Sequence, residues 1–315
     1  MSKLILAIPS KGRLKEQTDT YLREAGLKLK QTGGDRGYAA ELRGIDGVEI
    51  QLLSAGEIAR GLISGAIHLG VTGEDLLRES VSDLESLVHL LKPLGFGFAK
   101  LIVAAPKSWI DVETIADLNE VGAQHQERTG RRMRVATKYT RLAREFFAAK
   151  GVGHYRIVES AGATEGAPMT GAADLIVDIT TTGATLEANG LKIIPDGQIL
   201  ASQAMLAASL KVDWTTQQIE TLRVLLDYIE ARQRAKDVKT LRFAPELDIE
   251  AISKEFPESN LGLIGPGQAF CAAGSAQRLA QRMSHESGKA VRIHEAELIF
   301  EAQNTVFKGF LAAKG

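Results

Sequence analysis

Short apolar runs alternate with amphipathic segments along most of the chain. Residues 3–8 predict a strand buried on both faces, residues 9–13 a tight polar turn, and Leu14, Tyr21, Leu22 and Ala25 then fall on one helical face. The same order recurs at 48–64 and from 67 onward. Further apolar strands are predicted at 101–105, 133–136, 156–159 and 175–179, with a helix at 141–149. Such alternation indicates an α/β fold with mostly parallel sheets.

Three loops in this pattern are rich in Gly, Thr and charged residues. They cover residues 9–13, 72–75 and 180–185, and each follows a predicted strand. Ligands of open α/β sheets bind beyond the carboxyl ends of the strands, so these loops are the predicted binding edge.

The last hundred residues follow a different pattern. Residues 215–236 are polar and helical, with one apolar face that includes Leu222, Leu225 and Ile229, which predicts a connecting helix. Beyond it we predict helices at 276–283 and 306–312 and strands at 290–293 and 296–300. Residues 240–315 are therefore expected to form a small α+β module.

Composition narrows the class of protein. The 315 residues suggest two or three domains, and a formal net charge of −1 does not favour a nucleic-acid binder. No apolar run approaches the roughly 20 residues of a membrane span, and the start of the chain lacks the pattern of a signal peptide. The single cysteine, Cys271, cannot form an internal disulfide, which fits a cytoplasmic protein.

The richest chemistry lies in residues 174–186, which read Asp-Leu-Ile-Val-Asp-Ile-Thr-Thr-Thr-Gly-Ala-Thr-Leu. A phosphate at a helix start meets free backbone N–H groups, threonine hydroxyls add donors, and Gly183 allows close approach. Asp178, at the strand end, is placed to accept hydrogen bonds from ribose hydroxyls, and Asp174 lies on the same strand face. The alternative is an ordinary capped strand-to-helix turn.

Residues 174–186 are similar to the phosphoribosyl pyrophosphate loop of the ATP phosphoribosyltransferase family, which the chain resembles. The resemblance rests on an ordered set of segments over the first two thirds of the chain. They are residues 7–14 (AIPSKGRL), 69–76 (LGVTGEDL), 94–97 (LGFG), 135–139 (VATKY) and 159–168 (ESAGATEGAP).

The resemblance implies a two-lobed catalytic core like a periplasmic binding protein. Lobe I would comprise residues 1–93 and 184–212, lobe II residues 94–183, followed by a connecting helix at 213–239 and a C-terminal regulatory or oligomerisation module at 240–315. It also implies the reaction, in which N1 of ATP attacks the anomeric carbon of phosphoribosyl pyrophosphate and pyrophosphate leaves. The Mg²⁺ cofactor would be carried by the pyrophosphate, without a dedicated metal cage in the protein.

Site residues follow from the same resemblance. Lys11 and Arg13 are assigned to catalysis, because departing pyrophosphate needs positive charge nearby; a solvated turn with two mobile cations is the alternative. Phosphoribosyl pyrophosphate is assigned to Glu165, Asp178, Thr181, Thr182, Gly183, Ala184 and Thr185. Contacts to ATP or pyrophosphate are assigned to Gly73, Glu74, Asp75, Lys138, Tyr139 and Asp174. The alternative is that Lys138 is an exposed cation and Tyr139 a half-buried ring, with no role in binding.

Some positions depart from the family pattern, and others have more than one interpretation. Ser54 stands where family members often carry an arginine, and Arg60 is a possible substitute. His68 replaces a common acid and is predicted to be structural. The basic run at 128–134 fits contacts to ATP phosphates, a contact to another subunit, or a solvated loop.

The resemblance further implies histidine as feedback inhibitor and a homo-oligomer, with a regulatory subunit similar to histidyl-tRNA synthetase in the short form of the family. The catalytic region is closest to that short form, yet a hundred residues follow it. Three other functions compete with this one. A non-catalytic solute-binding protein would be expected to carry a secretory signal. A catalytically idle regulatory subunit would be expected to lose the loop at 180–185 or the loop at 9–13, and a phosphoribosyltransferase for free purines would usually place two adjacent acids before its loop.

Overall fold

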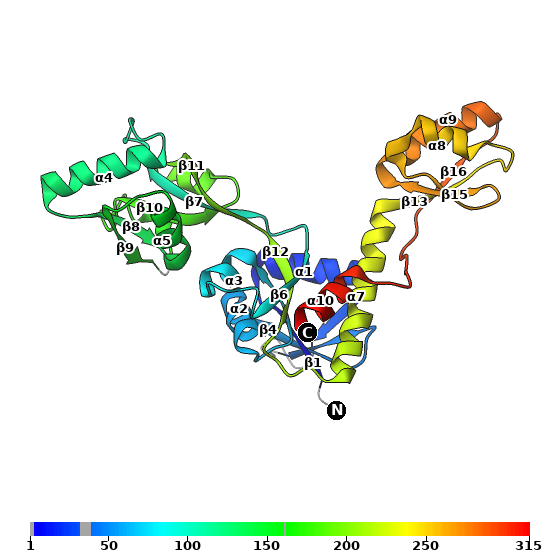
Figure 1. Ribbon diagram of the computed structural model, residues 1–315, viewed down its shortest axis with the longest axis horizontal. Helices are drawn as coiled ribbons and strands as arrows, with labels where there is room; N and C mark the ends of the chain where they lie inside the picture. Colours follow the sequence, from blue (N-terminus) through cyan, green and yellow to red (C-terminus); the bar gives the residue numbers. More distant parts are fainter. Residues whose placement is uncertain (1–2, 32–38, 161) are drawn as a thin grey trace.

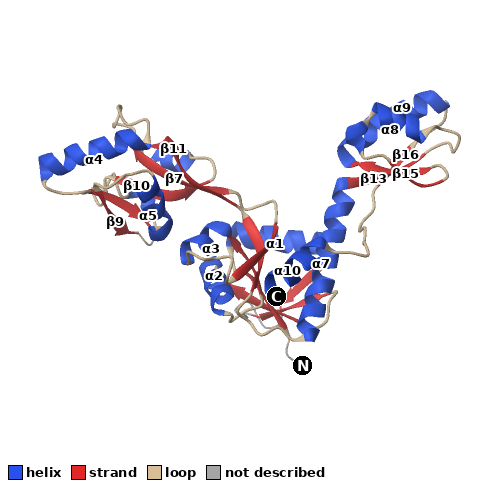
Figure 2. Ribbon diagram, viewed as in Figure 1, coloured by secondary structure: helices blue, strands red, loops and turns tan. Residues whose placement is uncertain are grey.

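The computed structural model describes residues 3–31, 39–160 and 162–315. Met1, Ser2 and Ala161, the last from the segment at 159–168, lie outside these ranges. The chain forms two α/β lobes and a C-terminal module (Figures 1 and 2). Within the described ranges, no helix combines the length and apolar character that crossing a membrane requires.

Lobe I is a seven-stranded sheet covered by helices on both faces. Its strand order is β2-β3-β4-β1-β5-β12-β6, and the central pairs of β1 with β4 and β5 are parallel. Its strands are β1 (Leu4–Pro9), β2 (Lys28–Gln31), β3 (Ala39–Arg43), β4 (Val48–Leu53), β5 (Leu69–Gly73), β6 (Val88–Pro93) and β12 (Ala204–Ser209). Its helices are α1 (Gly12–Glu24), α2 (Ala55–Ser64), α3 (Glu74–Ser80), α7 (Thr216–Asp237) and α10 (Thr305–Lys314).

Lobe II is built on a five-stranded sheet in the order β11-β7-β10-β8-β9. Strands β8, β9 and β10 are parallel, and β7 and β11 run antiparallel at one side. The strands are β7 (Ala99–Pro106), β8 (Met133–Thr137), β9 (Tyr155–Glu159), β10 (Leu175–Thr180) and β11 (Leu191–Ser202). The helices are α4 (Ile115–Thr129), α5 (Thr140–Ala149), the 3₁₀ turn η1 (Thr164–Gly166) and α6 (Ala184–Ala188).

The predicted α/β class with two lobes is confirmed, and both sheets are mixed rather than parallel throughout. Parallel pairing joins β4, β1 and β5 in lobe I and β10, β8 and β9 in lobe II, and apolar strands such as β1 and β10 are buried from both faces. The antiparallel members are the strands that cross between the lobes, β7, β11 and β12, together with strands next to them or at the sheet edge.

The C-terminal module has the connectivity of a split β-α-β fold. Two helices cover one face of an antiparallel sheet in the order β14-β15-β13-β16, with a core that includes Leu241, Cys271 and Leu279. Its elements are β13 (Val238–Arg242), α8 (Ile249–Glu255), η2 (Pro257–Ser259), β14 (Gly262–Gly265), β15 (Gln268–Ala272), η3 (Ala273–Ser275), α9 (Ala276–Ser287) and β16 (Arg292–His294).

The lobe boundary predicted at 184 is wrong. Residues 184–202 form α6 and β11, and β11 pairs with β7 of lobe II up to Ser202. The chain enters lobe I only at β12, which pairs with β5. Backbone pairing of β11 with β7, which runs from Leu191 opposite Pro106 to Ser202 opposite Ala99, keeps this segment in lobe II.

The end of the chain also differs from the prediction. Residues 296–300 form no strand; they run back along α7, where the Ile299 N–H donates to the Ala231 carbonyl at 3.0 Å. Helix α10 then packs on lobe I, with Phe310 fully buried beside Trp214. The last ten residues therefore do not lie with the C-terminal module (Figure 1).

Candidate functional site

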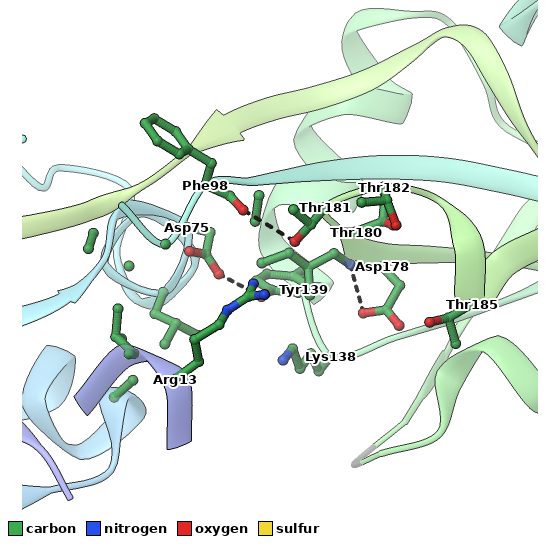
Figure 3. Close-up of a pocket in the computed structure, with 18 of the residues that line it drawn as sticks. Arg13, Asp75, Phe98, Lys138, Tyr139, Asp178, Thr180, Thr181, Thr182 and Thr185 are labelled. Atoms are coloured by element: carbon green, nitrogen blue, oxygen red, sulfur yellow. Dashed lines mark hydrogen bonds between the residues drawn. The ribbon is translucent and has the colours of Figure 1, made fainter. Parts of the chain in front are cut away.

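A cavity of about 570 Å³ lies between the two lobes, at the carboxyl ends of their parallel strands. Lobe I contributes the loops after β1, β4 and β5, and lobe II those after β8, β9 and β10. Figure 3 shows Arg13 reaching from one side toward Tyr139, with Asp178 and the threonines on the other side. This is the edge at which α/β sheets bind ligands.

The lobe I side is open and positively charged at the start of α1. Gly12 has φ +76°, which turns the chain sharply from β1 into the helix and brings Arg13 to the cavity wall. The Arg13 guanidinium is exposed, and no hydrogen bond or ion pair joins it to the described residues. Lys11 is the residue before the helix, and its side chain does not line the cavity.

The lobe II side is the loop at residues 180–185, which we call the threonine loop. Gly183 has φ +80°, a left-handed conformation, and its N–H donates to Thr180 Oγ1 at 2.9 Å. The Thr181 hydroxyl donates to the Phe98 carbonyl at 3.3 Å, and Thr182 Oγ1 accepts from the Ala184 N–H at 3.3 Å. The backbone N–H groups of Thr181 and Thr182 have no acceptor within the described chain. The loop is therefore fixed by its own hydroxyls while two amides remain available.

Asp178 stands at the end of β10, facing the cavity from lobe II. Burial is the largest influence on its carboxyl and raises its pKa above the usual 3.8, and the nearby Glu165 charge acts in the same direction. A 2.8 Å hydrogen bond from the Ile179 N–H and the Lys138 charge oppose the rise. The site thus holds a carboxylate that lacks enough hydrogen-bond donors of its own.

Asp178→Asn is expected to increase the stability of the ligand-free protein at neutral pH. A carboxyl whose pKa is raised by folding binds its proton more tightly in the folded state, so its ionisation costs folding free energy as pH rises through that value. The side-chain oxygen of the introduced asparagine still accepts the hydrogen bond from the Ile179 N–H, but the side chain carries no charge. Urea denaturation from pH 7 down to about pH 4, close to the usual carboxyl pKa, should show an advantage that shrinks as pH falls through the raised pKa of Asp178. An advantage that is undiminished at the lowest pH would contradict the assignment to charge.

A buried hydrogen-bond chain joins the lobes at the floor of the cavity. The Tyr139 hydroxyl, on lobe II, donates to Asp75 Oδ2 of lobe I at 2.6 Å, and the Ser202 hydroxyl donates to Asp75 Oδ1 at 2.8 Å. Tyr139 is 1% exposed and Asp75 5%. Burial, followed by the Asp75 charge, raises the pKa of Tyr139 well above its usual range, so the phenol remains a donor.

A second contact between the lobes lies beside this chain. The Glu79 carboxylate, on α3, accepts from the backbone N–H groups of Arg141 and Leu142 at 2.9 and 3.0 Å. A carboxylate of lobe I thereby caps the start of α5 in lobe II. Together the two contacts join α3 of lobe I to the start of α5 in lobe II.

Tyr139→Phe is expected to lower the free energy of unfolding by about 1–2 kcal/mol, because Asp75 loses one of its two side-chain donors in a buried site. Chemical denaturation followed by circular dichroism measures the change. Tyr155→Phe is the matched control, since its ring packs on Phe147 in the core of lobe II and its hydroxyl has no hydrogen-bond partner in the described chain. Equal losses in the two variants would contradict a specific role for the Asp75 contact.

Most residues predicted from sequence line the cavity. They are Arg13, Gly73, Asp75, Lys138, Tyr139, Glu165, Asp178, Thr181, Thr182 and Thr185. Gly183 and Ala184 lie within the threonine loop between lining residues. Glu74 points elsewhere and forms an ion pair with Arg78 at 2.7 Å.

Asp174 does not belong to the cavity. It precedes β10, at the opposite end of the strand from Asp178, and forms a 3.0 Å ion pair with Arg134. Side chains four residues apart along a strand lie on the same face but are separated by more than about 10 Å. Asp174 and Asp178 therefore share a face of the strand without sharing a site.

Several lining residues were not predicted from the sequence. Gln17 lies one helical turn after Arg13, and Phe98, 56% exposed, follows the segment at 94–97. The helical spacing from Arg13 and the position next to residues 94–97 were signals for these two residues. Arg60 is not among the lining residues, and Ser54 caps α2 through a reciprocal pair of bonds with Glu57.

His68 has a structural setting. It is 7% exposed, its Nδ1 accepts from the Ile5 N–H at 3.2 Å, and its ring meets Trp214 edge-on at 5.1 Å. Burial lowers its pKa, so the neutral ring is favoured as an acceptor.

Comparison with known proteins identifies relatives over the whole chain. The family model described as ATP phosphoribosyltransferase matches residues 54–229. An ATP phosphoribosyltransferase of Caulobacter vibrioides is 52% identical over 318 residues, covering 98% of this chain and 97% of that protein. One from Bradyrhizobium diazoefficiens is 47% identical over 313 residues, covering 96% of each.

A solved structure adds a likeness in three dimensions. It is the ATP phosphoribosyl transferase (HisG:HisZ) complex from Thermotoga maritima, with a TM-score of 0.54 and 26% sequence identity. The match covers 98% of that chain but 72% of this one. The present chain therefore extends beyond that protein, whereas the Caulobacter relative matches nearly its full length.

Proposed function

The chain belongs to the ATP phosphoribosyltransferase family, and from this we propose that the cavity between its lobes is the active site. The enzyme is a transferase that joins ATP to phosphoribosyl pyrophosphate, giving N1-(5-phosphoribosyl)-ATP and pyrophosphate, the first step of histidine biosynthesis. The observation that carries the proposal is the threonine loop and Asp178 facing Arg13 across one cavity.

The threonine loop is proposed to hold the 5′-phosphate of the sugar. Free N–H groups at Thr181 and Thr182 and the hydroxyl of Thr185 supply donors around an anion. Helix α6 has only five residues, so individual donors rather than its dipole would dominate. The ribose hydroxyls would donate to Asp178 and Glu165, which supplies the hydrogen-bond donors that the Asp178 carboxylate lacks.

Catalysis in this proposal is mainly electrostatic. As the bond from the anomeric carbon to pyrophosphate lengthens, positive charge grows on the sugar and negative charge on the leaving group. Arg13, which has no partner among the described residues, would bind the departing pyrophosphate, and Lys138 adds charge from lobe II. Lys11 would act only at longer range, since its side chain does not line the cavity. The N1 atom of ATP then bonds to the anomeric carbon.

ATP is proposed to approach along the lobe I wall. Gly73 and Ala55 leave space there, and Gln17 adds a polar group one turn beyond Arg13. Asp75 and Tyr139, already bonded to each other, would set the spacing of the lobes rather than bind substrate directly.

Mg²⁺ fits this donor set. Within the described residues, no three or more His, Cys, Asp or Glu side chains gather as a metal cage. Asp178 and Glu165 are two carboxylates whose mutual repulsion a cation would relieve, and they would hold Mg²⁺ together with pyrophosphate oxygens and water. When bound, Mg²⁺ would supply positive charge that offsets the negative charge of pyrophosphate.

Regulation and assembly are further parts of the proposal. Histidine is the expected feedback inhibitor, and the enzyme is expected to work in the cytoplasm as a homo-oligomer. The chain in the Thermotoga complex pairs with a second protein, which supports a search for a regulatory subunit similar to histidyl-tRNA synthetase.

The direct test mixes purified full-length protein with ATP, phosphoribosyl pyrophosphate and Mg²⁺. We expect the ultraviolet change of N1-substituted adenine, dependent on all three and reduced by histidine. Addition of the regulatory subunit measures whether it is required. No product with either preparation would refute the assignment of activity.

A further inference from the structure

A second cavity, of about 700 Å³, lies on lobe II away from the proposed active site. Its walls carry Arg131 and Arg132 after α4, Arg134 on β8 and Arg156 on β9, and we call it the arginine cavity. The cavity sits at the amino ends of β8, β9 and β10, whereas the active site lies at their carboxyl ends. The chain's net charge is −1, so this concentration of positive charge is local.

Two of the arginines are forced together by strand pairing. Arg134 and Arg156 are register partners in the parallel pair of β8 and β9, so their side chains leave the same face of the sheet side by side. Like charges at this spacing repel, and one carboxylate is present to offset them. Asp174 accepts from Arg134 Nη2 at 3.0 Å and from the Arg134 backbone N–H at 2.7 Å.

Arg134 is fully engaged by the protein, whereas the other three are not. Its Nη1 also donates to the Gly171 carbonyl at 2.8 Å, which fixes the guanidinium in place. The exposed side chains of Arg131, Arg132 and Arg156 have no hydrogen bond or ion pair within the described chain. The arginine cavity therefore holds four guanidinium charges against one carboxylate.

From this arrangement we propose that the arginine cavity binds a multiply charged phosphate compound, at a site separate from the active site. Guanidinium groups bind phosphate oxygens in pairs, and three unpaired ones around a concave surface suit a di- or triphosphate better than a single anion. His125 and the Thr129 hydroxyl line the same cavity and add polar groups. The cavity is large enough for a nucleotide.

A simpler role for these cations is to offset the carboxyl end of α4, which lies beside Gly130. That role accounts for Arg131 and Arg132, which follow the helix. It does not account for Arg156, which comes from β9 and lines the cavity from another side. Arg156 is therefore the residue on which the two explanations differ.

The test titrates inorganic tripolyphosphate and ATP into the full-length protein by calorimetry at low ionic strength. We expect two sites per chain, one of which weakens at least about tenfold in Arg156→Gln and disappears in the triple variant R131Q/R132Q/R156Q. The remaining site, kcat and both KM values should not change, which separates this proposal from that of the active site. Arg128→Gln, on the last turn of α4 but outside the arginine cavity, should retain both sites.

Identical titrations of the wild type and the triple variant would overturn the proposal. So would binding of polyglutamate without binding of tripolyphosphate, because the cavity would then be a docking surface for an acidic polypeptide. Thermal unfolding without ligand shows whether Arg156→Gln remains folded, and the single variant keeps the test valid if the triple variant does not fold.

Discussion

Gly183→Val is expected to weaken the binding of phosphoribosyl pyrophosphate at least about tenfold. Gly183 has φ +80°, where an L-residue costs roughly 1–2 kcal/mol and a β-branched one more. A Cβ here would meet only Ile193 Cδ1 at 3.6 Å, so packing leaves room for the side chain and the backbone carries the strain. Relief of the strain would rotate the peptide groups of the threonine loop and turn their N–H groups away from the phosphate. A loss of about 1.4 kcal/mol in binding free energy corresponds to a tenfold weaker affinity.

Calorimetry with phosphoribosyl pyrophosphate alone measures this effect. The matched control is Gly190→Val, at the other end of α6, where φ is +69° and a Cβ would meet nothing within 4 Å. It imposes similar backbone strain without touching the threonine loop, so its affinity should remain that of the wild type. Unchanged affinity in Gly183→Val, or an equal loss in both variants, would contradict the placement of the phosphate.

Arg13→Ala is expected to lower kcat by about 10–150-fold, with a smaller change in KM. A charge-assisted hydrogen bond contributes on the order of 1.5–3 kcal/mol, and here it would strengthen as negative charge develops on pyrophosphate. An interaction made mainly in the transition state appears in kcat rather than in KM. Steady-state kinetics with each substrate varied in turn measures the two effects.

Lys15→Ala serves as control for Arg13→Ala. Lys15 lies on the same helix but pairs with Asp19 at 2.5 Å and does not line the cavity, so its loss should leave kcat unchanged. Arg13→Lys should recover part of the activity, since it retains the charge but not the paired donors. An effect of Arg13→Ala on KM alone would mean that the guanidinium binds the substrate in its ground state.

Local patterns predicted the strands and loops that line the proposed active site. The apolar run before Asp178 predicted β10, and the threonines and Gly183 that follow predicted a phosphate loop at its end. Order along the chain also placed the loops after β1, β5 and β10 at one edge of their sheets. These features depend on residues that are neighbours in the chain. Because ligands of open α/β sheets bind at the carboxyl ends of the strands, loops that are distant in sequence can be assigned to one site.

Contacts between distant segments decided what the sequence left open. Asp75 and Tyr139 were assigned to substrate, yet they bond each other across the lobes, which only the packing of α3 against α5 determines. Asp174 shares a face with Asp178 but meets Arg134 at the other end of the strand.

By itself, the sequence determined the alternation of strands and helices, the family and the loops that carry the donors, because each depends on residues adjacent in the chain. Tertiary structure decided the partners of those donors. It also decided that β11 stays with lobe II, that α10 returns to bury Phe310 in lobe I, and that Arg156 joins the arginines after α4. Burial and charge pairing act through space, and no periodicity along the chain records them.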